Sequence, residues 1–177
     1  MKVFQPAPER STAANVARTL VQTTMFWTVF IVVLPSAIHA GEQALGLPAF
    51  TFPGHRIVAA IVFAGMTAMN LGSGIVMAIA GRGTPFPADT ARALVVRGPY
   101  RYLRNPMSFS GLGVGIAIAL WLGSWPIIGY VVVGGLMWHL IARPMEERDL
   151  EERFGESYRR YRTHVRTWIP RITSYEP

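Results

Sequence analysis

Three long stretches without a charged side chain constrain the fold of this sequence more than any other feature. They comprise residues 19–41, 57–81 and 105–142 of the 177 residues. The first two match the roughly 20 residues that a helix needs to cross a bilayer. The third would form a helix of about 57 Å, which is too long for one crossing. Because Gly123-Ser124-Trp125-Pro126 near its middle is a turn signal, we predict a helical hairpin there.

The pattern predicts an all-α fold, a polytopic membrane helix bundle with about four transmembrane helices. A hydrophobic content of 51% and a mean hydropathy of +0.29 agree with this class. We expect one integral-membrane domain over residues 1–177, with a cytoplasmic tail at 1–19 and a cytoplasmic amphipathic helix and tail at 143–177. The four spans should fill residues 20–142, at about 20–40, 56–80, 107–122 and 126–142.

The basic residues predict the orientation. Lysines and arginines gather before the first span, between the second and third spans and after the fourth, whereas the opposite side has only Arg56. Because cytoplasmic loops are enriched in these residues, both termini should be cytoplasmic, in a bacterial inner membrane. The net charge of +7 then lies on one face, which anionic lipid head groups attract. The bilayer, and not nucleic acid, is therefore the expected partner.

A cleavable signal peptide is the competing interpretation of the first span. It is disfavoured because the preceding segment is long and Ile38-His39-Ala40 is a poor cleavage site. No metal is expected, since the sequence has no cysteine and its four histidines lack metal-ligand spacing.

A polar helix should follow the fourth span, from about residue 144 to 163. Pro144 suits the first turn of a helix, and the pair Glu146-Glu147 suits its N-terminal end. One stripe of this helix combines a carboxylate with apolar side chains, at Glu147, Leu150, Phe154 and Tyr161. A carboxylate that serves only solubility is expected on the polar face of such a helix, and not on its apolar stripe. We therefore predict that Glu147 binds a ligand.

A dinucleotide-binding fold is excluded, because no strand is followed by a G-x-G-x-x-G turn. The G-x-G runs that begin at Gly72, Gly111 and Gly113 lie within predicted spans. Small residues at such positions favour close packing of helices, and we interpret them in this way.

Four spaced motifs in the second half of the chain carry a family resemblance. They are Gly98-Pro99-Tyr100-Arg101-Tyr102-Leu103-Arg104-Asn105-Pro106-Met107, the pair Glu146-Glu147 with Leu150, Phe154-Gly155 with Tyr158 and Tyr161, and Trp168-Ile169-Pro170. As an ordered set over about residues 81–171, they resemble the isoprenylcysteine carboxyl methyltransferase and phospholipid (phosphatidylethanolamine) methyltransferase superfamily. The resemblance implies a membrane helix bundle that holds S-adenosylmethionine at its cytoplasmic side. It also implies a lipophilic acceptor that arrives from the bilayer.

The motifs leave the acceptor open. Carboxyl methyltransferases usually have His where this chain has Asn105, and Asn-Pro-Met is similar to the phospholipid N-methyltransferases. Conversely, Phe154-Gly155 and Tyr158 resemble the carboxyl methyltransferases, and Ser108-Phe109 replaces the tyrosine that usually follows the proline. Three acceptor groups fit these motifs: a carboxylate, a thiol and an amine. The molecule that carries the group can be prenylated, a phospholipid or a smaller hydrophobic compound. The oligomeric state is equally open.

The residue types present suit methyl transfer, which requires that donor and acceptor be positioned and water be excluded. Glu146 or Glu147 can bind the amino group of the cofactor, tyrosines can contact its adenosine and sulfonium, and Arg104 or Arg101 can pair with its carboxylate. Arg143 can steer an anionic acceptor. The expected catalytic residues are Asn105, Arg143 and Glu147. The expected cofactor-binding residues are Gly98, Tyr100, Tyr102, Arg104, Asn105, Pro106, Glu146, Glu147, Tyr158 and Tyr161.

Two other functions fit parts of the pattern. Integral-membrane sterol reductases are similar in their C-terminal half and would bind NADPH there, although four spans are few for that group. A non-catalytic membrane scaffold is the non-enzymatic alternative. It predicts that replacement of Glu147 or Asn105 leaves the cellular role intact.

Overall fold

The computed structural model describes residues 4–176, and these residues contain helices and no named strand. The α-helices are α1 (Thr12–Trp27), α2 (Leu34–Ala44), α3 (His55–Ala80), α4 (Pro106–Leu122), α5 (Trp125–Met137) and α6 (Arg143–His164). Two π-helical segments, η1 (Thr28–Val33) and η4 (Trp138–Ala142), join α1 to α2 and α5 to α6. Two 3-10 turns lie between α3 and α4, at η2 (Pro87–Asp89) and η3 (Gly98–Arg101). The predicted all-α class is confirmed.

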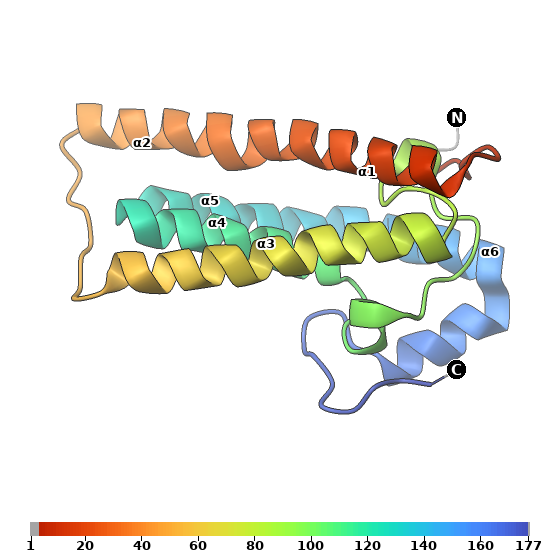
Figure 1. Ribbon diagram of the computed structural model, residues 1–177. Helices are drawn as coiled ribbons and strands as arrows, with labels where there is room; N and C mark the ends of the chain where they lie inside the picture. Colours follow the sequence, from red (N-terminus) through yellow and green to blue (C-terminus); the bar gives the residue numbers. More distant parts are fainter. Residues whose placement is uncertain (1–3, 177) are drawn as a thin grey trace.

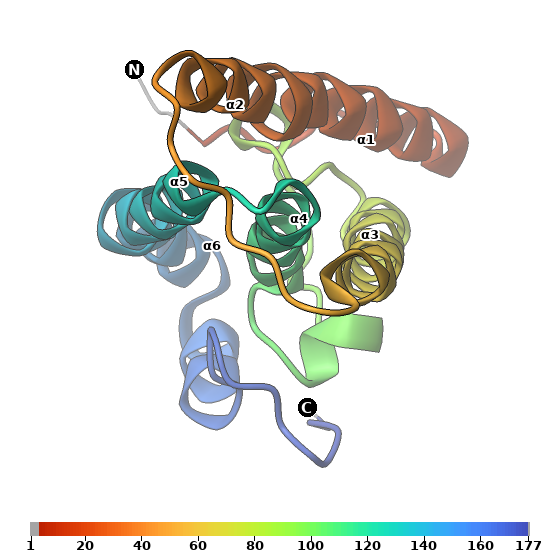
Figure 2. The same ribbon diagram turned by 90° about the vertical axis from the view of Figure 1, so that its left-hand side faces the viewer.

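Three continuous helical stretches are long and apolar enough to cross a membrane. They cover residues 12–44, 55–80 and 125–164, and α4 is a shorter apolar helix of 17 residues. Figure 2 shows α4 between α3 and α5, and it packs against both. Val114 and Ala119 of α4 are completely buried. The short third span expected from the sequence is thus the central helix of the bundle.

Local signals explain where these helices begin and end. Asn105 caps α4, because its Oδ1 accepts a hydrogen bond from the backbone N–H of Ser108 at 3.2 Å, and Pro106 occupies the first helical position. The predicted turn between the third and fourth spans is confirmed. Gly123 ends α4 in the left-handed region with φ 68°, and Ser124 caps α5.

The N-terminal segment is fixed to the connection between α3 and α4. The first helix begins well before residue 20, where the first span was expected. The backbone of residues 5–7 bonds to that of residues 87–90. Arg10 and Arg18 both form ion pairs with Asp89, at 2.8 and 2.9 Å. The polar composition of this segment favours a free tail. It does not reveal these contacts, because they join positions about 70 to 80 residues apart in the sequence.

The helix after the fourth span is present, but it bends at Gly155. Gly155 has φ 52° and ψ −127°, angles that glycine tolerates because it has no Cβ. The bend divides the single stripe expected on this helix and folds its second half back (Figure 1). Both halves then meet in one cluster, formed by Leu150, Phe154, Tyr158, Tyr161, Val165 and Tyr175 with Leu94 and Val96.

The two ends of the bundle differ in charge. Both termini, the α3–α4 connection and α6 lie at one end, whereas the α2–α3 connection and the α4–α5 turn lie at the other (Figure 1). Among the described basic residues only Arg56, in the first turn of α3, belongs to the second end. The charge asymmetry of the sequence therefore runs along the bundle axis. This arrangement agrees with a location of both termini on one side of a membrane.

Candidate active site

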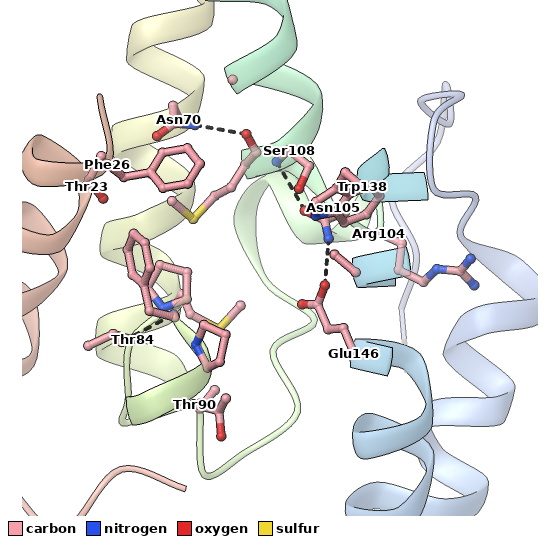
Figure 3. Close-up of a pocket in the computed structure, with 18 of the residues that line it drawn as sticks. Thr23, Phe26, Asn70, Thr84, Thr90, Arg104, Asn105, Ser108, Trp138 and Glu146 are labelled. Atoms are coloured by element: carbon pink, nitrogen blue, oxygen red, sulfur yellow. Dashed lines mark hydrogen bonds between the residues drawn. The ribbon is translucent and has the colours of Figure 1, made fainter. Parts of the chain in front are cut away.

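A cavity of about 590 Å³ lies between the helices and extends to the end of the bundle that holds the termini. Its walls come from α1, α3, α4, α5, α6 and the α3–α4 connection (Figure 3). Polar and charged side chains of the connection and α6 line one part, and apolar side chains of α1, η1, α4 and α5 line the other. A cavity of this size can hold a small-molecule ligand.

Glu146 and Asn105 meet in the polar part. Nδ2 of Asn105 donates a hydrogen bond to Oε2 of Glu146 at 3.2 Å, while its Oδ1 caps α4 (Figure 3). Burial, followed by the charge of Glu147, raises the pKa of Glu146 from 4.5 to about 7. No cation of the described residues lies within ion-pair distance of Glu146. A half-buried carboxyl with a raised pKa at a cavity wall is a candidate binding group for a cationic ligand.

Glu147, the next residue of α6, has different partners. Its Oε1 pairs with Nη2 of Arg104 at 2.9 Å and with Nη1 of Arg143 at 3.4 Å. Arg104 also donates from Nη1 to the carbonyl oxygen of Arg162 at 3.1 Å. Two arginines therefore neutralise Glu147, and Glu147 in turn holds Arg104 at the wall of the main cavity.

Three tyrosines, Tyr100, Tyr158 and Tyr161, line the polar part beside Glu146. The hydroxyl of Tyr161 donates to the carbonyl oxygen of Tyr100 at 2.6 Å. Burial raises the pKa of all three phenols, so they stay neutral at physiological pH. The buried hydroxyl of Tyr158 has no hydrogen-bond partner in the described part of the chain, although buried hydroxyls are normally paired.

Most of the remaining lining residues are apolar. Their large side chains include Phe26, Phe30, Leu112, Val131 and Met137, and glycines at 111 and 134 leave space between them. Both π-helical segments contribute, through Phe30 and Trp138 among others. Single π-helical turns within α-helices are frequent at functional sites. The cavity thus places a polar compartment next to an apolar one.

The structure brings most of the predicted site residues together. The main cavity is lined by Tyr100, Arg104, Asn105, Glu146, Tyr158 and Tyr161. A second cavity of about 20 Å³ adjoins it and is lined by Arg143 and Glu147 among others. Three predicted residues line neither cavity, namely Gly98, Tyr102 and Pro106.

These three residues have visible structural roles. Gly98 adopts φ 53° at the start of η3, next to Val76. Pro106 is the buried first residue of α4. The carbonyl oxygen of Tyr102 accepts a hydrogen bond from the backbone N–H of Arg171 at 2.9 Å. They shape the walls without contacting the cavity.

Sequence reasoning misses several lining residues. Asn70 of α3 donates from Nδ2 to the carbonyl oxygen of Met107 at 2.9 Å, and its polar side chain within an apolar span was a usable signal. Arg153 donates to Oγ1 of Thr90 at 2.6 Å and so ties α6 to the α3–α4 connection. From the sequence alone, its position on the helix predicts an arginine that faces solvent. No local pattern could have placed Arg153 at the cavity.

The fold and the cavity define a class of protein, an all-helical membrane protein in which buried ionisable groups adjoin apolar walls. A sequence model of the phospholipid methyltransferase family matches residues 55–157, and the chain belongs to this family. The match covers α3, α4, α5 and the part of α6 that carries Glu146. It confirms the superfamily that the motifs predict, and it implies methyltransferase activity in general. Comparison with curated proteins and with solved structures yielded no match.

Proposed function

We propose that the protein transfers a methyl group from S-adenosylmethionine to a lipophilic acceptor at the cytoplasmic surface of the membrane. The observation that carries the proposal is the cavity in which Glu146 and Asn105 adjoin the apolar walls of α1, α4 and α5. A charged, water-soluble donor and a membrane-soluble acceptor must meet in such a place. Membership in the phospholipid methyltransferase family supports the same reaction.

The residues of the polar compartment fit this donor. S-adenosylmethionine carries a sulfonium and an ammonium group, and Glu146 is a half-buried carboxyl whose only hydrogen bond among the described residues comes from an amide. Pairing with a cation would offset the cost of a buried negative charge. Arg104 can bind the carboxylate of the cofactor, and the rings of Tyr100 and Tyr158 can contact its adenine and sulfonium.

When bound, S-adenosylmethionine supplies an electrophilic methyl group. The protein then contributes orientation and exclusion of water. Asn105 orients Glu146, and Glu147 holds Arg104 through the 2.9 Å ion pair. Because Arg143 borders only the small cavity, we propose that it acts by positioning Glu147. In the other compartment, apolar side chains keep water from the reacting atoms.

We propose a phospholipid amine as the first candidate acceptor and an isoprenylcysteine-type carboxylate as the second. The family match and the Asn-Pro-Met run at 105–107 support the first. Both acceptors carry a long apolar chain that the walls of α1, α4 and α5 can receive. The methylated product therefore has to distinguish them.

A transfer assay tests the reaction. Purified protein in nanodiscs is incubated with methyl-labelled S-adenosylmethionine and a bacterial lipid extract, and the lipids are separated. We expect base-stable label in a phospholipid head group, whereas base-labile label would indicate a carboxyl ester. If the folded protein neither binds S-adenosylmethionine nor labels a lipid, the proposal is wrong. Binding of NADPH instead would favour the reductase alternative.

A matched pair of glycine variants tests the apolar compartment. Gly134 lines the cavity, and a Cβ at this position meets no atom within 4 Å, so Gly134→Leu adds volume without a clash at Cβ. Gly129 is equally open but lies outside the cavity lining. We expect Gly134→Leu to reduce transfer to lipid while S-adenosylmethionine still binds, and Gly129→Leu to change neither. Equal transfer by both variants would argue against this route for the acceptor.

A further inference from the structure

The segment after α6 returns to the bundle instead of leaving it. The backbone N–H of Arg104 donates to the carbonyl oxygen of Arg166 at 3.0 Å, and that of Arg171 donates to the carbonyl oxygen of Tyr102 at 2.9 Å. Both contacts involve residues just before α4. Residues 165–173 are therefore held at the level of the bundle where α4 begins.

Trp168 sets the depth of this segment along the bundle. Its Nε1–H donates a hydrogen bond to Nδ1 of His139 at 2.9 Å, and its ring packs edge-on against that of Trp138 at 5.2 Å between centroids. Both partners belong to η4, which ends the apolar part of the third continuous helix. Trp168 thus lies beside the last turns of a membrane span, the level at which tryptophans gather in membrane proteins.

The neighbours of Trp168 expose apolar side chains at this level. Ile172 is 100% exposed and Ile169 is 59% exposed. On the adjacent turns of η4, Leu140 and Ile141 are also exposed, and they would face lipid if the third continuous helix crosses a membrane. The two isoleucines continue the apolar character of that surface.

We propose that residues 165–173 form an interfacial membrane anchor. Ile169 and Ile172 enter the edge of the hydrocarbon layer, and the exposed Arg166 lies among the phosphate groups of anionic lipids. The partner is the bilayer because the exposed isoleucines lie at the depth of the lipid-facing η4 and are flanked by arginines. The inference rests on the placement of the bundle across a membrane that the proposed function requires.

The anchor also bears on the active site. Arg104 donates to the carbonyl oxygen of Arg162 and to Oγ1 of Thr167, and it pairs with Glu147. Contact of this segment with lipid therefore stabilises the position of an arginine that lines the cavity. The cofactor compartment would be held in place from the membrane surface.

The absence of cysteine allows a clean labelling experiment. Single variants Ile172→Cys, Val133→Cys and Glu156→Cys receive a nitroxide label in nanodiscs that contain anionic lipid. Collisions with oxygen, which partitions into lipid, and with a water-soluble nickel chelate are then measured. Val133, 55% exposed in α5, is the lipid reference, and the exposed Glu156 in α6 is the water reference. None of the three side chains contributes to the cavity wall.

We expect the oxygen-to-nickel collision ratio at 172 to match that at 133 more closely than that at 156. Addition of Ile169→Asp should move the ratio at 172 toward the water reference, whereas Ile169→Leu should not. A water-like ratio at 172 would overturn the anchor, and so would protection from both reagents, which would indicate cover by a second copy. A water-like ratio at 133 would overturn the placement of the bundle across the membrane. Failure of the anchor can therefore be distinguished from failure of the membrane placement that the proposed function requires.

Discussion

Replacement of Glu146 by glutamine tests the polar compartment through stability. Burial, with the charge of Glu147 as the second cause, raises the pKa of Glu146 in the folded protein from 4.5 to about 7. Between these values the folded protein keeps a proton that the unfolded chain releases. The stabilising contribution of Glu146 is therefore complete below about pH 4.5 and is lost as the pH rises through about 7.

The size of the effect follows from the same values. The difference between 4.5 and about 7 corresponds to about 3 kcal/mol, because one pKa unit is worth about 1.4 kcal/mol. Glutamine keeps an oxygen that can accept from Asn105, but it cannot ionise. Ligand-free Glu146→Gln should therefore be more stable than the unsubstituted protein by about 3 kcal/mol at pH 8 and by less than about 1 kcal/mol at pH 5. Such a gain is typical of a site where binding, and not stability, requires the charge.

Unfolding of both proteins in nanodiscs, followed by tryptophan fluorescence between pH 5 and pH 8, measures this difference. At about 100 times its Kd, S-adenosylmethionine should add about 2.7 kcal/mol to the unsubstituted protein and much less to Glu146→Gln. Glu152→Gln, at an exposed position of α6, is the matched control and should behave like the unsubstituted protein. Parallel pH profiles for Glu146→Gln and the unsubstituted protein would refute the raised pKa of Glu146 in the folded protein. Equal stabilisation of both proteins by S-adenosylmethionine would refute the role of Glu146 in binding the cofactor.

Substitutions at three further positions separate individual contacts. Asn105→Asp keeps the cap of α4 but removes the amide that donates to Glu146, so we expect kcat/KM to fall about 10- to 100-fold. Asn105→Ala removes the cap as well and should in addition lose about 1 kcal/mol of stability. Asp89→Asn weakens the ion pairs with two N-terminal arginines and should increase proteolysis near the N-terminus, with a loss of about 1–3 kcal/mol in unfolding experiments. Tyr161→Phe removes the bond to the carbonyl oxygen of Tyr100 and should cost about 1–2 kcal/mol by the same measurement.

Two of these predictions have a control variant in the chain. Glu9→Gln weakens only an exposed ion pair with Arg92, and because exposed pairs contribute little to stability it should leave proteolysis nearly unchanged. Tyr102→Phe alters a tyrosine that is 41% exposed and should leave stability unchanged. Wild-type kcat/KM for Asn105→Asp would show that its amide donor is dispensable. If either control loses as much as its partner variant, the assigned contact is not the cause.

Local sequence information predicted the helices well because their causes are local. Charge-free runs set the candidate spans, and the Asn-Pro pair at 105–106 marked the start of α4. The Gly123 turn separated α4 from α5 as expected. The ordered motifs placed the chain in its superfamily, which the family match over residues 55–157 confirms. Each of these features depends on side chains within a few residues of one another.

Only the tertiary structure distinguished the two neighbouring glutamates. Adjacent residues of a helix point about 100° apart, so the rotation of α6 against α4 decides which carboxyl reaches the cavity. Glu146 meets Asn105 there, whereas Glu147 is neutralised by Arg104 and Arg143. The apolar stripe favoured Glu147 because periodicity describes one helix without its neighbours.

Long-range contacts decided the rest of the fold and of the site. Asp89 binds arginines from the start of the chain, and the bend at Gly155 brings Tyr158 and Tyr161 to the same cavity. The sequence by itself thus predicted an all-helical membrane protein and a set of candidate residues for its chemistry. The tertiary structure determined which of them share a cavity, because that depends on contacts between positions tens of residues apart.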